Sequence, residues 1–300
     1  MPRRWRKPFR NFVAVCLVIL IGQSLVPAGA VAVAGQAVAQ QAVAQRVVAP
    51  ASITAQSHTV QSHTVQSQRS ELNLLTPNLI VLKAADLYIQ RTSLGRYLRF
   101  ESGLGNIGRG PIEVRPNNNQ SCPEGKRHAT QIIYRDVDGS RFYRRDVDTE
   151  FARRSAGCMV FHIAHDHWHF QAASRYTLFQ PGEDRSLVRV VQRKMSFCLR
   201  DSRRLPSRYG GASNRPQFYG GCSKYSPQGI STGWADIYQS FLAGQAVRLP
   251  ASAGKGLYCL QIKVDPKNLL VESDDEDNTS MRAFTLKGDN VTFQPTARCT

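Results

Sequence analysis

The sequence predicts an all-β fold, a β-sandwich with an immunoglobulin-like core and long loops pinned by disulfides. From Leu72 onward, short apolar runs alternate with polar residues at period two, and Gly, Pro, Asn and Asp separate them. No stretch shows the apolar spacing of a long amphipathic helix. Asp136–Ser140 has the composition of a hairpin turn between two of the runs. The runs most typical of strands are 79–82, 97–100, 131–134, 141–143 and 257–264.

Composition narrows the class of protein. A hydrophobic fraction of 42% in 300 residues excludes a multi-span membrane protein and a wholly disordered chain. Lys and Arg number 39 against 22 Asp and Glu, a net charge of +17 that suits an anionic partner. The cations are scattered and form no nucleic-acid-binding motif, so we expect anionic envelope polymers rather than nucleic acid as the partner.

The N-terminal segments predict export. Residues 1–30 have a cationic start, an apolar run over 12–26 and an Ala-x-Ala-like site at Ala28 and Ala30, the order of a cleaved signal peptide. An uncleaved N-terminal anchor is the alternative, and no integral membrane segment is expected after cleavage. Residues 31–70 repeat Ala, Val, Gln and Ser and predict a disordered tether. The folded domain is therefore expected over 71–300, in a secreted, extracellular or cell-envelope protein.

Export determines how the cysteines are interpreted. Six cysteines remain after Cys16 is removed with the signal peptide. An even number in an oxidising compartment favours disulfides over metal thiolates. Among the pairings that six cysteines allow, spacing favours Cys122–Cys158, Cys198–Cys222 and Cys259–Cys299.

Histidines give the most specific chemical signal. Four of the seven fall within residues 162–169, and His165, His167 and His169 alternate. On a strand, alternate side chains project from one face, so these three are expected to converge there. Three imidazoles with open positions beside them suit Cu(II) or Zn(II).

Four segments resemble the lysyl oxidase family and follow the family's order. Residues 162–178 resemble its copper-binding segment and 193–201 its cofactor-lysine segment, and the resemblance continues at 228–237 and 264–278. The resemblance implies that His165, His167 and His169 bind copper.

The resemblance also implies the reaction and its organic cofactor. Enzymes of this family use oxygen to oxidise a primary amine to an aldehyde, releasing ammonia and hydrogen peroxide. Their quinone, lysine tyrosylquinone, forms from one lysine and one tyrosine of the chain, and the lysine carries over to Lys194. The family's tyrosine precedes an Asp-Ile-Asp-like step, whereas residues 232–236 contain no tyrosine. Tyr238 and Tyr225 are the nearest phenols, and we assign Tyr238.

An acidic segment predicts a second metal site. Residues 272–278 hold five carboxylates and an amide, which repel one another unless they are solvated or neutralised by a cation. Oxygen ligands favour Ca²⁺, and in the resembling family this segment binds calcium together with one near the domain start. The alternative is a solvated acidic turn. The expected ligands are Asn78, the Leu79 carbonyl, Glu272, Asp274, Asp277 and Asn278.

The sequence thus favours an enzyme, a secreted copper-dependent amine oxidase that acts on lysyl or small primary amines. A non-enzymatic copper-binding β-domain without the quinone is the main alternative. A zinc hydrolase with Asp236 as general base is the third.

Overall fold

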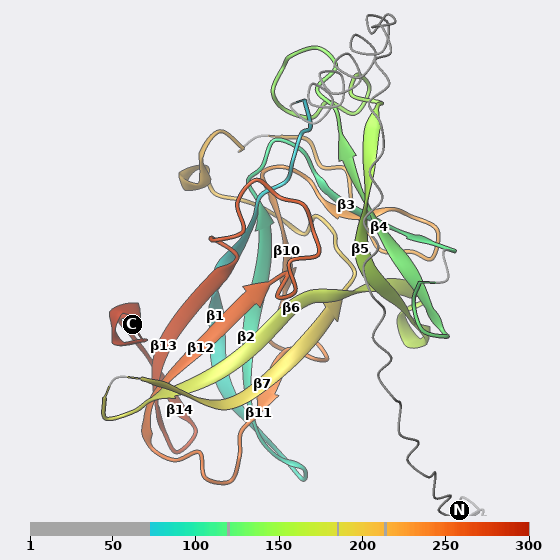
Figure 1. Cartoon of the computed structure of the whole chain (residues 1–300). Helices are drawn as coiled ribbons and strands as arrows, with labels where there is room; N and C mark the ends of the chain where they lie inside the picture. Colours follow the sequence, from blue (N-terminus) through green and yellow to red (C-terminus); the bar gives the residue numbers. More distant parts are fainter. Residues whose placement is uncertain (1–72, 119–120, 185, 213–214, 300) are drawn as a thin grey trace, which may run out of the picture. The chain divides into compact units, whose positions relative to one another are not determined.

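A computed structural model describes residues 73–118, 121–184, 186–212 and 215–299 (Figure 1). The predicted signal peptide, the tether and Cys16 lie outside the described residues. Within these ranges no helix has the length and apolar character needed to cross a bilayer. The strands are β1 (Leu79–Thr92), β2 (Gly95–Asn106), β3 (Ile112–Asn117), β4 (Lys126–Tyr134), β5 (Phe151–His162), β6 (His167–Pro181), β7 (Leu187–Phe197), β8 (Arg203–Arg204), β9 (Gln228–Ile230), β10 (Trp234–Tyr238), β11 (Ala246–Arg248), β12 (Gly256–Val264), β13 (Thr279–Lys287) and β14 (Asn290–Gln294).

These strands form two antiparallel sheets. One has the order β1-β2-β10-β8, with β11 also paired to β2. The other runs β14-β13-β12-β6-β5-β4-β3-β9, with β7 also paired to β6 (Figure 1). The described helical segments are three short 3₁₀ turns. The predicted all-β class is confirmed, whereas its immunoglobulin-like character stays a prediction.

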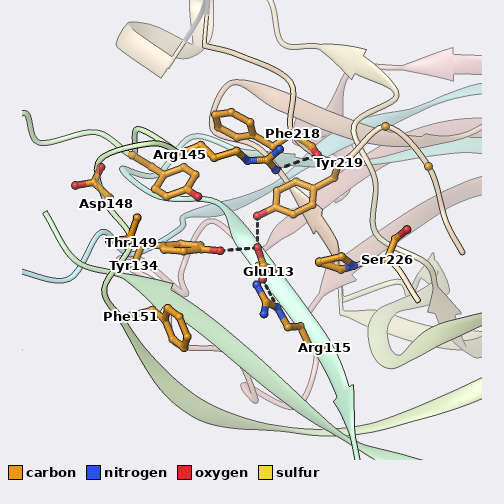
Figure 2. A pocket seen from close by; sticks show the side chains of 14 residues that line it. Glu113, Arg115, Tyr134, Arg145, Asp148, Thr149, Phe151, Phe218, Tyr219 and Ser226 are labelled. Carbon is orange, nitrogen blue, oxygen red and sulfur yellow. Dashed lines mark hydrogen bonds and ion pairs between the residues drawn. The ribbon is translucent and has the colours of Figure 1, made fainter. Parts of the chain in front are cut away.

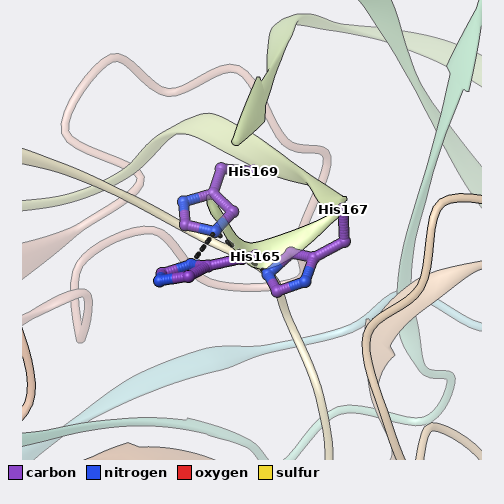
Figure 3. A group of neighbouring side chains, drawn as sticks. All are labelled: His165, His167 and His169. Atoms are coloured by element: carbon purple, nitrogen blue, oxygen red, sulfur yellow. Dashed lines mark hydrogen bonds between the residues drawn. The ribbon is translucent and has the colours of Figure 1, made fainter. Parts of the chain in front are cut away.

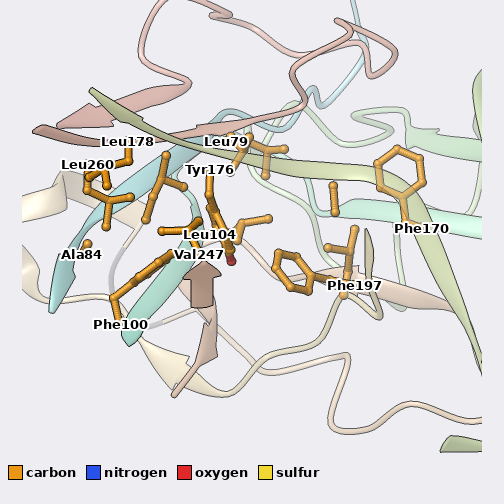
Figure 4. Packing of buried hydrophobic residues seen from close by; sticks show 14 of the residues in the cluster. Leu79, Ala84, Phe100, Leu104, Phe170, Tyr176, Leu178, Phe197, Val247 and Leu260 are labelled. Carbon is orange, nitrogen blue, oxygen red and sulfur yellow. The ribbon is translucent and has the colours of Figure 1, made fainter. Parts of the chain in front are cut away.

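A single large core joins the two sheets. Leu98, Phe100 and Leu104 of β2 pack with residues of β6, β12 and β13 from the other sheet (Figure 4). The rings of Phe100 and Tyr176 meet edge to face with their centroids 4.8 Å apart. Because side chains from both sheets bury their apolar surface in this one cluster, the sandwich arrangement expected from period-two patterning is present.

Residues 135–150 form an irregular loop, although the sequence predicted a hairpin turn and a strand there. The strand predicted at 141–143 and the hairpin at Asp136–Ser140 are wrong, because β4 pairs directly with β5. The Asp148 carboxylate accepts the backbone N–H groups of Val137 at 3.0 Å and Arg144 at 2.7 Å. These donors are therefore satisfied within the loop and do not join a ladder.

The disulfide predictions are confirmed. Cys122–Cys158, Cys198–Cys222 and Cys259–Cys299 are all bonded. Cys198–Cys222 closes the long connection after β7, where only the short strands β8 and β9 and one 3₁₀ turn interrupt irregular chain among the described residues. The predicted disulfide-pinned loop is therefore present, and it brings Cys222 beside the end of β7.

Candidate metal centre

The three alternating histidines converge, but not by the route that the sequence suggested. β5 ends at His162, a 3₁₀ turn covers Ile163–His165, and β6 begins at His167. Asp166 has a left-handed backbone with φ 53°, which turns the chain between His165 and His167. The expectation that all three lie on one strand is therefore wrong, because His165 enters from the turn.

Their ring nitrogens nevertheless meet at one point (Figure 3). His169 Nε2 lies 3.1 Å from His167 Nε2 and 3.4 Å from His165 Nδ1. All three ligand atoms lie within 4.8 Å of one another. The His162 ring stacks on that of His165 with centroids 3.9 Å apart, so it packs against the trio. The trio fits a metal ion with three nitrogen ligands and open positions.

Lowered pKa values keep two of the three histidines in the neutral form that binds a metal cation. Burial, followed by the neighbouring histidines, lowers the pKa of His169 to about 4. Burial is also the main cause that lowers the pKa of His167. At neutral pH both imidazoles are therefore neutral and offer a lone pair to a metal.

The trio opens into a cavity of about 670 Å³ between the end of β7, the strand β10 and the Cys198–Cys222 disulfide. Tyr238 on β10 lines this cavity with the histidines. Its ring stacks on Phe197 with centroids 4.0 Å apart, and its hydroxyl donates to the Cys198 carbonyl at 2.8 Å. Burial and the nearby Asp236 raise the pKa of Tyr238, so it stays a neutral phenol. Phe197 and Cys198 thus fix the orientation of this ring.

Asp236 contributes a buried acid to the same cavity. It is 1% exposed, and its Oδ2 has no hydrogen-bond partner among the described residues. Burial raises its pKa, while the charge of Arg200 acts in the opposite direction. It is the one carboxyl group among the described residues that line this cavity.

Lys194 lies elsewhere. It is exposed on β7, whereas its neighbour Met195 lines the histidine cavity and Arg193 donates to the Ala246 carbonyl at 2.9 Å. Lys194 is not among the described residues that line that cavity. It is in register with Arg175, which in turn pairs with Lys263, so three cations stand side by side. The structure therefore places Tyr238, and not Lys194, beside the histidines, while Tyr225 is 87% exposed.

The acidic segment forms a partly buried cluster. Asn78 Nδ2 donates to Asp277 at 3.1 Å, and Asn278 Nδ2 donates to Glu272 at 2.7 Å. The Leu79 N–H also donates to Glu272, at 2.7 Å. Asp274 is exposed and accepts the N–H of Glu276. Of the predicted ligands, the structure thus brings together the side chains of Asn78, Glu272, Asp277 and Asn278.

The chemistry of this cluster fits a hard cation. Oδ1 of Asn78, of Asp277 and of Asn278 is buried without a hydrogen-bond partner among the described residues. Burial raises the pKa of Glu272 to about 7 and is the main cause that raises the pKa of Asp277. Buried oxygens that lack donors, beside carboxylates that are costly to ionise, suit Ca²⁺.

Sequence reasoning did not assign Asp265 to this acidic region. It is 2% exposed, its Oδ1 has no partner among the described residues, and its charge acts on Glu272. The one feature of the sequence that could have indicated Asp265 was its position in the segment 264–278, which resembles the family.

A second cavity, of about 610 Å³, centres on Glu113 of β3 (Figure 2). Glu113 is 2% exposed and its Oε2 accepts the hydroxyls of Tyr134 at 3.0 Å and Tyr219 at 2.6 Å. Its Oε1 accepts Arg115 Nε at 2.5 Å. Because Tyr219 lies three residues before Cys222, this buried carboxylate clamps the segment that reaches the histidine cavity. Sequence reasoning missed Glu113, since its partners come from distant parts of the chain.

Replacing Glu113 with Gln is expected to lower the free energy of unfolding by about 1–3 kcal/mol, because two phenols then face an amide in place of a buried carboxylate and the half-exposed ion pair with Arg115 is lost. Urea unfolding measures this loss. Hydrogen exchange at Tyr219 should also accelerate. Glu124→Gln, which alters an exposed carboxylate, is the matched control. An unfolding free energy equal to that of the control would contradict the clamp.

Comparison with known proteins identifies the family to which the chain belongs. The family model for lysyl oxidase matches residues 140–296, which include the histidine trio, Lys194, Tyr238 and the acidic segment. No curated protein matched the chain. The family match covers more than half of the 300 residues, and it spans the converging histidines and the cavity beside them. The chain belongs to the lysyl oxidase family.

Proposed function

We propose that this protein is a secreted copper-dependent amine oxidase, which converts primary amines to aldehydes with oxygen and releases ammonia and hydrogen peroxide. Membership of the family supports the reaction class. One observation carries the proposal: three converging imidazoles and a half-buried tyrosine stacked on Phe197 line the same cavity. A metal and an organic cofactor in this cavity would act on one substrate.

His165, His167 and His169 would hold the copper ion. When bound, copper and the quinone supply the redox chemistry that the side chains of the chain lack. Phe197 and the Cys198 carbonyl orient Tyr238. Asp236 Oδ2, which is buried and has no hydrogen-bond partner among the described residues, would accept the proton that leaves the carbon bearing the amine.

Quinone assembly from Lys194 and Tyr238 requires Lys194 to leave its exposed place on β7, outside the histidine cavity. Arg175 lies directly opposite Lys194 in the ladder, and two cations opposed in this way destabilise the strand pair. Removing the charge of Lys194 by cross-linking would relieve that repulsion. The same placement favours a second candidate function, a copper-binding domain in which Lys194 stays a surface cation and no quinone forms.

The acidic cluster around Glu272 would bind Ca²⁺ as a structural ion through Asn78, Asp277 and Asn278. Three disulfides suit an oxidising compartment, in line with a secreted, extracellular or cell-envelope location. The large positive charge would hold the protein near anionic envelope polymers, an interaction that salt should weaken.

Tyr238→Phe tests the leading function. In wild-type protein matured with copper and oxygen, we expect peroxide release from a panel of primary amines and a phenylhydrazine adduct. Peptide mapping should show a cross-link between Lys194 and Tyr238. The substitution removes one phenolic oxygen from a packed ring, so the variant should fold and bind copper, yet lose peroxide release by about 100-fold or more. Tyr225→Phe, at an exposed phenol, is the control that should retain activity.

One result would decide against the oxidase, and another would decide against Tyr238 as the source of the quinone. Copper-loaded wild-type protein that forms no cross-link and releases no peroxide would establish the copper-binding alternative. Peroxide release unchanged in Tyr238→Phe would assign the quinone to another tyrosine.

A further inference from the structure

A basic groove lies next to the histidine cavity. It has a volume of about 660 Å³, and four cationic side chains and one carboxylate, Glu101, line it. Its remaining walls include apolar side chains of β1 and β13 such as Val81, Leu82 and Met281. The four cations are Lys83, Arg203, Arg208 and Arg282.

Arg203 connects the groove to the candidate active site, because this one residue lines both cavities. Its guanidinium donates to Glu101 at 3.0 Å, so the single acid of the groove is already paired. Arg200 adds another cation on the histidine side. A ligand that extends from the histidine cavity past Arg203 therefore enters the groove directly.

The other three cations lack an acidic partner in the part of the chain that the structure describes. Among the described residues, no carboxylate lies within ion-pair distance of Lys83, Arg208 or Arg282. The guanidinium of Arg208 stacks over the Tyr209 ring at 5.0 Å. Arg282 stacks over Phe293 at 4.9 Å and donates to the Ala84 carbonyl at 2.8 Å. Two guanidinium groups are therefore held in place without a carboxylate partner among the residues that the structure covers, which leaves their charge available to an anionic ligand.

This charge bears on the proposed substrate. A free primary amine is a cation at neutral pH, so the arginines near the cavity repel a simple alkylamine or a lysine in a basic segment. Carboxylates beside the target amine would reverse that repulsion and pair with the groove. Nucleic acid would satisfy the cations but has no aliphatic primary amine to place in the histidine cavity.

We propose that the basic groove binds an acidic polypeptide segment, rich in Asp and Glu, and thereby presents a lysine of the same segment to the histidine cavity. The substrate class rests on the proposed amine oxidase function, whereas binding in the groove does not require turnover. The apolar walls would contact the peptide backbone and aliphatic carbons, and the cations would pair with its carboxylates.

Binding is tested first, with a substrate that cannot react. Fluorescence anisotropy compares a labelled peptide that carries norleucine in place of lysine between Asp and Glu residues with one carrying Ser and Gln in their places. The acidic peptide is expected to bind about tenfold or more tightly, and raising NaCl from roughly 50 to 300 mM should remove most of the difference.

Matched double variants locate the binding. Lys83→Glu/Arg208→Glu should lower the affinity for the acidic peptide to that for the neutral one. Lys255→Glu/Lys287→Glu makes the same change in net charge at exposed lysines outside the groove and should retain the preference. Equal loss in both double variants, or equally tight groove-dependent binding of a single-stranded oligodeoxynucleotide, would overturn the proposal in favour of non-specific charge attraction.

Peroxide release from the lysine-containing forms of the two peptides and from propylamine separates the two proposals. Turnover of propylamine with no preference for the acidic peptide would overturn the substrate class and leave the oxidase intact. Groove-dependent binding of the acidic peptide without turnover of any amine would overturn the oxidase and leave the binding site intact.

Discussion

His169→Ala is expected to weaken copper binding by about 10³-fold, the largest single effect that the structure predicts. Its Nε2 is the atom nearest to the ring nitrogens of both other ligands, so the substitution leaves two nitrogens without their common neighbour. Competition with a chelator of known affinity measures the loss, and metal analysis after dialysis gives the stoichiometry.

His128→Ala provides the control for this experiment. Its ring contacts Ser155 and Asn117, away from the trio, so one copper per chain should be retained. Because His169 is buried, His167→Ala at the strand start is measured in parallel, and circular dichroism confirms that both variants fold. Copper affinity unchanged in both folded variants would rule out the trio as the copper site.

Glu272 is expected to link stability to pH and calcium. In the absence of divalent cations its pKa is about 7 in the folded protein and about 4.5 when unfolded, because burial penalises the charged form. The folded state therefore holds a proton that the unfolded state releases between these values. The stabilisation is complete below pH 4.5 and is lost as pH rises through 7, a change of about 3 kcal/mol.

The measurement compares wild-type protein with Glu272→Gln in a chelator, because the low pKa of His169 acts in the opposite direction over nearly the same pH range. Relative to that variant, the unfolding free energy of the wild type should fall as pH rises. Calcium at about 100 times its dissociation constant should restore about 2.7 kcal/mol. Glu276→Gln, at an exposed carboxylate of the same turn, should keep both effects. Parallel pH profiles of wild type and Glu272→Gln, with no response to calcium, would show that the segment is a solvated acidic turn.

Local pattern was enough to predict much of the fold. Period-two alternation identified β1, β2, β4 and β12. A strand with one buried face carries apolar residues on that face and polar residues on the other, so its own sequence shows the alternation. The three disulfides join cysteines close in sequence, so spacing identified them. The 141–143 run was misleading, because Tyr143 is buried against Tyr134 by loop packing and not by strand pairing.

At the candidate metal centre, the sequence predicted which kinds of residue take part but not where the fold places them. Alternating histidines indicated a metal, yet the left-handed turn at Asp166 that brings His165 to the others has no clear sequence signature. The exposed position of Lys194 depends on the register of β7 against β6, which pairs it with Arg175. The Glu113 clamp and the basic groove arise from contacts between residues far apart in the chain, which one sequence does not reveal.

The most direct test of the account is electron paramagnetic resonance of the full protein titrated with Cu(II). The converging rings of His165, His167 and His169 predict one tetragonal copper signal that saturates at one equivalent and shows superhyperfine coupling to three nitrogens. A signal coupled to fewer nitrogens, or copper spread over several sites at one equivalent, would contradict it.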